Sequence, residues 1–237
     1  GHNEGLFALD EDARTHWLKV FALLFSREAF LPSGPDPRTF HQRALEEGKY
    51  YEERVADNLS RLVFEQVYPE LIRALAAASP ATGLQEVREA ALILLYRLLF
   101  ILYAEDRDLL PVRDNRYDDY SLREKVRLDV GNRFDRSDVF SDTAARYWAT
   151  ISDLFNAIDK GDGSIGLPPY NGGLFDADKT PLLGAVRIPD AVLAGVIDTL
   201  SFERTREGRK YINYRSLSVQ QLGSIYERLL EYEVIRD

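Results

Sequence analysis

The stretch from Ala90 to Pro111, AALILLYRLLFILYAEDRDLLP, constrains the fold of this chain more than any other. From Ala90 to Ala104 only Arg97 interrupts a run of apolar and aromatic residues. A helix that is apolar on every side must be buried in a protein core or in a membrane. A membrane span needs about 20 apolar residues with few charges, and here a charged cluster begins at Glu105. We therefore expect a core helix surrounded by other helices, which Pro111 ends because proline cannot donate into the last turn.

The end of this helix carries three carboxylates, Glu105, Asp106 and Asp108. They fall where the helix macrodipole is negative, which is unfavourable unless cations neutralise them. We expect Arg107, or a basic group from elsewhere in the chain, to pair with them. Two interpretations remain open: a solvated and capped helix end, or a catalytic carboxylate cluster.

The composition limits the classes of function. Of the 237 residues, 45% are hydrophobic and 29% are charged, as in globular proteins of one or two domains. The net charge of −9 argues against a surface that binds nucleic acid everywhere, although a local basic patch is compatible with it. Without cysteine there are no disulfides, cysteine–zinc sites or thiol catalysis, and the three histidines lack metal-ligand spacing.

The opening Gly1-His2 is typical of a cleaved tag, so we expect a segment of a longer protein.

Helical periodicity recurs along most of the chain. Before the central helix we expect one helix from Asp10 to Phe30 and a second from an N-cap at Thr39 to about Val67, which kinks at Pro69 or gives way there to a new helix ending at Ala78. After the central helix we expect a short helix that begins with a capping box at Ser121–Glu124, and a helix from about Asp142 to Lys160 with Gly161 as its C-cap. The last two helices run from a cap at Asp190 to about Leu200 and onward from a capping box at Ser218–Gln221. The alternating segments SFERT and KYINY predict a β-hairpin near residues 201–214. Residues 161–189 are expected to form an ordered irregular loop, long enough to be functional.

The sequence therefore predicts an all-α fold with one small β-hairpin. We expect a single helical domain over residues 1–237. It could be divided into N-terminal helices at 1–80 and a central-helix core at 84–237.

Two short motifs match ligand-binding signatures without their context. Gly161 to Gly166 reads G-x-G-x-x-G, but the dinucleotide fingerprint follows a strand and opens a helix, whereas here a helix precedes and prolines follow. Leu167-Pro-Pro-Tyr170 is similar to the Asn-Pro-Pro-Tyr element of adenine methyltransferases, but leucine cannot bind an exocyclic amine. We expect the second motif to be a stiff turn that places Tyr170 in the core.

A third pattern is that of the PD-(E)xK nucleases. In Pro35-Asp36 with Glu47-Gly-Lys49, Asp36 and Glu47 would bind Mg²⁺ and Lys49 would help to activate water. That chemistry requires Glu47 and Lys49 on a core β-strand, whereas the surrounding residues favour a helix. A small Mg²⁺-dependent nuclease is therefore an alternative that strands in this region would support.

The predicted hairpin is a local basic feature in an acidic chain. Its candidate DNA phosphate contacts are Arg204, Arg206, Arg209, Lys210 and Arg215. The alternative is a solvated hairpin tip.

Several stretches together resemble one family. AEDRDLLP after the apolar helix, then PPYNGGLFD, then LSVQQLGSIYERLLEY are similar, in this order and spacing, to the helical middle region of large single-chain restriction–modification enzymes of the type IIG class and related phage-defence adenine methyltransferases. FSREAF and YYEERVADNL also fit, so the resemblance covers most of the chain. The motif residues that we take to be structural are Glu105, Asp106, Arg107, Tyr170, Asn171, Gly172 and Gly173.

The resemblance implies a non-catalytic connector between a nuclease module upstream and a methyltransferase module that begins shortly after the counterpart of Leu217 to Tyr232. The parent would be a cytoplasmic, site-specific adenine DNA methyltransferase and endonuclease that uses S-adenosylmethionine and Mg²⁺, with neither bound by this segment. No position here matches a catalytic residue of the family. The implied partners are the two modules of the parent chain, with DNA as a further partner and no membrane. A stand-alone helical interaction protein is the second alternative.

Overall fold

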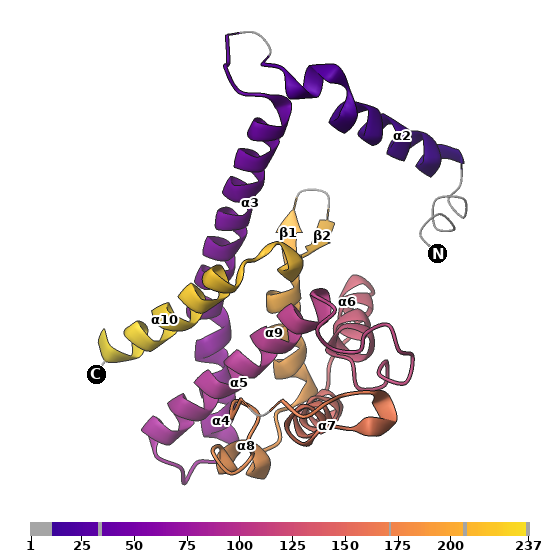
Figure 1. Ribbon diagram of the computed structural model, residues 1–237. Helices are drawn as coiled ribbons and strands as arrows, with labels where there is room; N and C mark the ends of the chain where they lie inside the picture. The colour runs from indigo at the N-terminus through magenta and orange to yellow at the C-terminus, as the bar shows by residue number, and fades with distance from the viewer. Residues whose placement is uncertain (1–10, 33–34, 171, 206–207, 236–237) are drawn as a thin grey trace. The chain divides into compact units, whose positions relative to one another are not determined.

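The computed structural model describes residues 11–32, 35–170, 172–205 and 208–235. The fold is mainly α-helical with one small antiparallel hairpin, as the sequence predicts (Figure 1). The chain divides into two compact units, residues 1–54 and 55–237. This division falls inside a helix and not near residue 80, where the sequence suggested that one could lie.

The first unit contains α2 (Glu11–Phe25), a 3₁₀ helix (Arg27–Phe30) and the beginning of α3 (Phe40–Leu62). α2 is shorter than the helix predicted to reach Phe30, because the backbone becomes extended at Ser26. Thr39 caps α3 as predicted: its hydroxyl accepts from the backbone N–H of Gln42 at 3.3 Å, and its own N–H donates to the Gln42 side chain at 2.8 Å.

The second unit holds the remaining elements. In chain order they are a π-helical turn (Val63–Val67), α4 (Tyr68–Ala78), α5 (Leu84–Asp106), a π-helical segment (Leu122–Arg127), α6 (Leu128–Asp135), α7 (Arg146–Lys160), a 3₁₀ turn (Gly163–Ile165), α8 (Pro181–Ala185), α9 (Asp190–Ser201), β1 (Phe202–Thr205), β2 (Gly208–Tyr211), a 3₁₀ turn (Tyr214–Ser216) and α10 (Val219–Ile235). Pro69 lies in the first turn of α4, where its missing N–H costs nothing, and the π-helical turn precedes it.

α5 is the core helix that the apolar run predicts. Within residues 90–105 only Ile93, Tyr96 and Phe100 are half-buried, and the others are buried. α4 packs along α5, and α8, the π-helical segment 122–127 and the 3₁₀ turn 214–216 also contact it. α9 is the second buried helix, and it contacts α4, α6 and α7. Burial of α5 on all sides therefore confirms the core-helix prediction.

The end of α5 differs from the prediction. Pro111 does not end the helix, which stops at Asp106 in a Schellman motif. The N–H of Asp108 donates to the Glu105 carbonyl at 3.2 Å, and the N–H of Leu109 donates to the Ala104 carbonyl at 2.8 Å. Asp108 takes the left-handed position of this motif, with φ 57°, where glycine is usual.

Helix α7 begins at Arg146, four residues later than predicted. The prediction that Asp190 caps its own helix was wrong, because Pro189 holds the N-cap position of α9. The Asp190 carboxylate instead accepts from the backbone N–H of Tyr147 at 3.0 Å. It therefore satisfies one of the free N–H groups at the start of α7, and sequence periodicity does not reveal such a contact between two helices.

The hairpin and the last helix follow the sequence closely. β1 pairs with β2 in antiparallel register, with Phe202 opposite Tyr211 and Arg204 opposite Arg209. The capping box predicted for α10 is present: the Ser218 hydroxyl accepts from the Gln221 N–H at 3.1 Å, and the Gln221 side chain accepts from the Ser218 N–H at 2.8 Å.

Candidate functional site: the loop on Arg97 and the acidic end of helix α5

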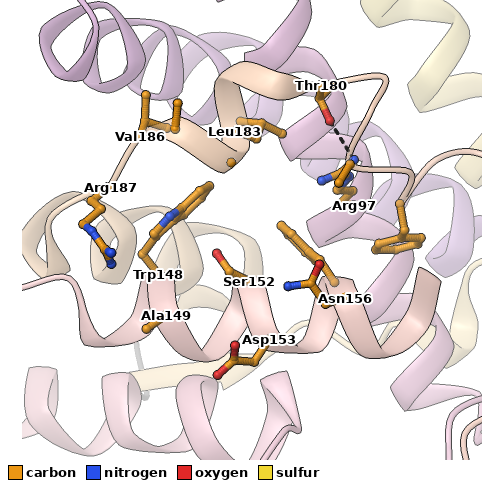
Figure 2. A pocket seen from close by; sticks show the side chains of 15 residues that line it. Arg97, Trp148, Ala149, Ser152, Asp153, Asn156, Thr180, Leu183, Val186 and Arg187 are labelled. Atoms are coloured by element: carbon orange, nitrogen blue, oxygen red, sulfur yellow. Dashed lines mark hydrogen bonds between the residues drawn. The ribbon is translucent and has the colours of Figure 1, made fainter. Parts of the chain in front are cut away.

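Arg97, the only charged residue in the apolar run of α5, holds the irregular loop that follows α7. Its side chain is buried, with the residue only 4% exposed. Nε donates to the Leu174 carbonyl at 2.8 Å, and Nη2 donates to the Asp176 carbonyl at 3.1 Å. Nη2 also donates to the Thr180 hydroxyl at 2.8 Å (Figure 2). The loop 172–180 is therefore held by hydrogen bonds to the buried guanidinium of Arg97, a residue of the core helix α5.

Two motif residues of this loop, Tyr170 and Gly173, have structural roles. The Tyr170 hydroxyl donates to the Leu109 carbonyl at 2.7 Å, which ties the loop to the end of α5. Gly173 has φ 72°, and a Cβ at this position would lie 2.6 Å from the Lys179 ammonium nitrogen. Gly172 is exposed, and Asn171 lies outside the described residues. The predicted placement of Tyr170 inside the core is only partly correct, since its side chain reaches the surface while packing against Phe100.

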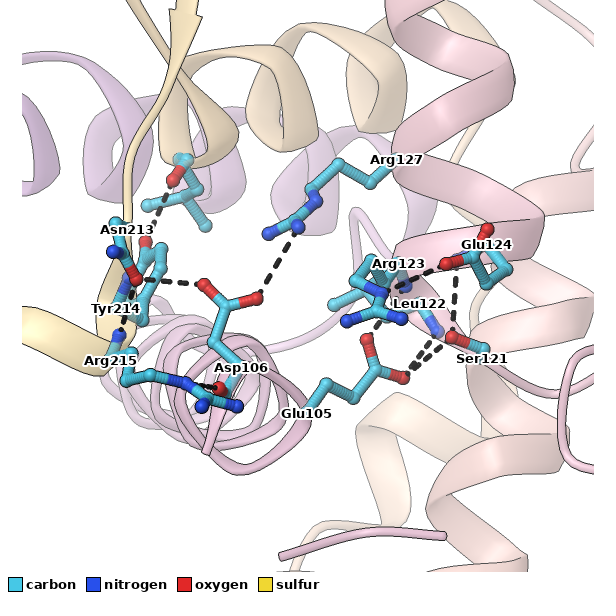
Figure 3. Close-up of polar contacts among 11 residues, drawn as sticks. Glu105, Asp106, Ser121, Leu122, Arg123, Glu124, Arg127, Asn213, Tyr214 and Arg215 are labelled. Atoms are coloured by element: carbon cyan, nitrogen blue, oxygen red, sulfur yellow. Dashed lines mark hydrogen bonds and ion pairs between the residues drawn. The ribbon is translucent and has the colours of Figure 1, made fainter. Parts of the chain in front are cut away.

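Residues Glu105–Asp108, the last residues of α5 and its Schellman turn, form what we call the acidic turn. Glu105 is buried, and its carboxylate accepts four hydrogen bonds. One comes from the Tyr117 hydroxyl at 2.9 Å. The others come from the Ser121 hydroxyl at 3.1 Å and the N–H groups of Leu122 and Arg123, both at 2.7 Å (Figure 3). Glu105 therefore caps the helical segment that begins at Leu122.

The electrostatics of Glu105 follow from this position. Burial raises its pKa to about 7, even though the hydrogen bonds from Tyr117, Leu122, Arg123 and Ser121 all act to lower it. The interpretation of the acidic turn as a solvated helix end was wrong for this residue.

Asp106 connects α5 to two further segments. Its carboxylate pairs with Arg127 at 3.3 Å and accepts from the backbone N–H of Tyr214 at 3.0 Å (Figure 3). The side chains of Asp106 and Arg127 are 10% and 7% exposed, so this ion pair is nearly buried. The end of α5 is thereby linked both to the start of α6 and to the segment that leads into α10.

Asp108 and Arg107 complete the acidic turn. The Asp108 carboxylate pairs with Arg113 at 2.7 Å and with Arg215 at 2.9 Å. Arg107 donates to the Leu217 carbonyl, and Arg215 donates to the Asp106 carbonyl at 2.7 Å. The expectation that basic groups from elsewhere pair with these carboxylates is confirmed for Asp106 and Asp108 but not for Glu105, which hydroxyl and backbone N–H groups hold instead. The sequence did not reveal that Tyr117 and Arg127 are partners of the acidic turn. The only signal near them was the capping box at Ser121, which predicts a helix start and no contact with α5.

The hairpin arginines do not gather on one basic face. The Arg209 side chain is only 16% exposed and pairs with Asp198 at 2.5 Å and with Asp135 at 2.7 Å. Arg215 belongs to the acidic turn. Arg204 is largely exposed, with an Asp198 oxygen at 3.8 Å.

Lys210 is exposed as well, and Arg206 lies outside the described residues. Arg209 and Arg215 are therefore neutralised by carboxylates of the same chain, and Arg204 and Lys210 are the described candidates that remain on the surface.

The metal-nuclease alternative fails on its geometry. Glu47 and Lys49 lie within α3, so the β-strand that PD-(E)xK chemistry requires is a helix here. Asp36 is engaged by Arg38, whose hydrogen bonds lower the pKa of the carboxyl to about 2. Among the residues that the structure describes, no group of three or more Asp, Glu or His side chains is arranged to hold a metal ion.

Comparison of the chain with protein-family models, with curated proteins and with solved structures gives no match. In the described ranges, no helix combines the length and the apolar character that a bilayer span requires. What the site geometry offers is a set of contacts that join three segments of the fold at the end of α5.

Proposed function

We propose that this chain is a non-catalytic helical connector that holds the nuclease and methyltransferase modules of a restriction–modification enzyme in a fixed relation. The observation that carries the proposal is the acidic turn. Glu105 binds the start of the helical segment at Leu122, whereas Asp106 and Asp108 both bind the turn just ahead of α10, through Tyr214 and Arg215.

The resemblance in sequence explains why this arrangement would matter. In the family that the motifs resemble, the methyltransferase follows the counterpart of α10. A structure that fixes the beginning of α10 against the core helix would fix the direction in which the next module begins. S-adenosylmethionine and Mg²⁺ would then belong to the modules, and DNA would meet this chain at the exposed hairpin residues Arg204 and Lys210.

The proposal is tested first on the gene. The complete reading frame is expected to encode a nuclease before this chain and an adenine methyltransferase after it. A frame that encodes neither module would contradict the proposal.

The second test uses the protein that this frame encodes. If the connector fixes the distance between modules, substitution of Asp106 and Arg215 by alanine should scatter the positions of DNA cleavage relative to the methylated site. The double variant Glu70→Ala with Arg73→Ala is the matched control, because this acid–arginine pair of α4 is exposed and lies outside both the acidic turn and the hairpin. Cleavage positions that stay unchanged in the folded double variant would argue against a mechanical role.

A stand-alone helical interaction protein is the second candidate, and α2 favours it. This helix exposes Trp17, Phe21 and Phe25, which are 54%, 61% and 62% exposed. Large apolar groups that gather on a surface mark contacts with other proteins. A reading frame limited to a chain of this size would favour the second candidate over the connector.

A further inference from the structure

A pocket of about 330 Å³ lies between α7 and the segment 177–187. α7 contributes Trp148, Ser152 and Asn156, which are four residues apart and so line one face of the helix. Figure 2 shows Ser152 and Asn156 beneath the loop that carries Thr180 and Leu183. The volume is at the lower end of the range for small-molecule sites, which is about 300–1,000 Å³.

Arg97 forms the inner end of this pocket and brings a positive charge into it. The acceptors of its guanidinium are the carbonyls of Leu174 and Asp176 and the hydroxyl of Thr180, all of them neutral. Across the described part of the chain, no carboxylate lies within ion-pair distance of it. Burial lowers the pKa of Arg97, and it outweighs the opposing attraction of the Asp159 and Asp176 carboxylates, which act on the guanidinium from beyond ion-pair distance. The loop engages Nε and Nη2, which leaves Nη1 for a further acceptor.

The remaining lining residues give the pocket a second cation and an aromatic wall. Arg187 is exposed at the rim, on the side of Trp148. Trp148 is buried and contributes an aromatic side chain to the lining of the pocket. Asp153, the one carboxylate among the lining residues, is exposed and lies across the α7 ribbon from Ser152 in Figure 2. Among the lining residues, two arginines thus face one peripheral aspartate, while Asp159 and Asp176, which are not lining residues, act on Arg97 from farther away.

We propose that this pocket binds a small organic anion, with its carboxylate or phosphate group on Arg97 and its planar part against Trp148. Arg187 closes the rim and adds a second contact to the charged group. Because Arg97 also holds the loop 172–180, an occupied pocket stabilises that loop against α5. This binding site is independent of the connector function, since none of its residues belongs to the acidic turn.

The chain offers a direct fluorescent test, because it contains only two tryptophans. Trp17→Phe leaves Trp148 as the sole reporter. Titration with benzoate and with phenyl phosphate should give saturable changes in its emission, and the stronger of the two identifies the preferred charged group. Benzamide has the same ring without the charge, and its affinity should be lower than that of benzoate by a factor of about ten or more. Inorganic phosphate tests whether the charged group suffices alone, and we expect it to bind more weakly than phenyl phosphate.

A variant that fills the pocket separates binding from folding. Gly184 lines the pocket in α8, and a Cβ there would meet nothing within 4 Å, so Gly184→Leu should occupy the space without a backbone clash. Gly195→Leu in α9 is the control, because Gly195 also has open space and does not line the pocket. Binding should be lost in Gly184→Leu and kept in Gly195→Leu, with both variants showing unchanged helical circular dichroism. Arg187→Gln should weaken the binding of both anions several-fold.

Two results would overturn the proposal. One is the absence of any saturable response to benzoate or phenyl phosphate up to about 10 mM, which corresponds to binding too weak to be specific. The other is binding that depends on neither the charge nor the pocket, seen as equal affinity for benzoate and benzamide or as affinity that persists in Gly184→Leu.

Discussion

At the scale of single residues, the fold buries the Glu105 carboxylate at an electrostatic cost. This carboxylate is buried at the end of the core helix, and four donors surround it. Desolvation outweighs these hydrogen bonds and raises the pKa to about 7. The stability of the chain should therefore depend on pH in a range where few other carboxylates titrate.

The direction of this dependence follows from the two protonation states. The unfolded chain releases the Glu105 proton near pH 4.5, whereas the folded chain holds it to about pH 7. Between these values the folded state binds more protons, so the free energy of unfolding falls as the pH rises. From pH 5 to pH 8 we expect a loss of up to about 3 kcal/mol in urea denaturation. Glu105→Gln should remove this pH dependence. If the free energy of unfolding of the variant falls with pH as steeply as before, the dependence belongs to another titratable group.

Arg209 gives a second prediction at this scale. Arg209→Ala leaves the buried Asp198 with only the exposed Arg204, at 3.8 Å, and the free energy of unfolding should fall by about 3 kcal/mol. Arg204→Ala, on the neighbouring strand, removes an exposed side chain and should cost less than about 1 kcal/mol. Chemical denaturation of both variants measures the difference. Equal effects would mean that Arg209 is not held as the structure shows.

These residues also show the limit of sequence reasoning. The sequence shows the excess of basic residues in the hairpin. It does not show which of their side chains are buried against carboxylates of the same chain. Asp135 lies 74 residues from Arg209 along the chain, and helical or strand periodicity does not encode such a pairing. Caps are different, because their partners are three residues apart. Ser218 with Gln221 could therefore be predicted in full, and Ser121 in part.

At the scale of secondary-structure elements, helix positions followed from periodicity, while helix ends depended on contacts between elements. The end of α5 was assigned to Pro111, but Asp108 adopts the left-handed conformation three residues earlier. Its two arginine partners, Arg113 and Arg215, hold the carboxylate there. Arg215 is distant in sequence, so composition near the helix end could not reveal this contact.

The approach of α6 to the hairpin gives a prediction for a pair of helical glycines. A Cβ on Gly131 would lie 2.7 Å from the Phe202 ring, whereas a Cβ on Gly195 would meet nothing within 4 Å. Gly131→Ala should therefore destabilise the chain by about 1–3 kcal/mol through overpacking, in spite of the higher helix propensity of alanine. Gly195→Ala should stabilise it by about 0.5–1 kcal/mol. Thermal denaturation measures both effects as shifts in the melting temperature. A shift of the same sign in the two variants would contradict the close packing of α6 on β1.

At the scale of the whole molecule, the fold class could be predicted because one apolar helix dictates it. A helix that is apolar all round needs other helices around it, and α4, α8 and the segment 122–127 contact α5 as this requires. The division of the chain between Arg54 and Val55 could not be predicted, since it falls within α3 and no loop marks it. The pocket beside Arg97 was equally hidden, because α5, α7 and α8 contribute its walls from distant parts of the sequence.

The central claim is that the acidic turn fixes α10 against the core, and a distance measurement tests it most directly. The chain contains no cysteine, so Lys160→Cys in α7 and Glu227→Cys in α10, both exposed, take spin labels at single sites. Pulsed electron paramagnetic resonance should give one narrow distance distribution, which broadens when Asp106 and Arg215 are replaced by alanine. Arg204→Ala should leave it unchanged. A broad distribution without these replacements, or an equally narrow one with them, would contradict the claim.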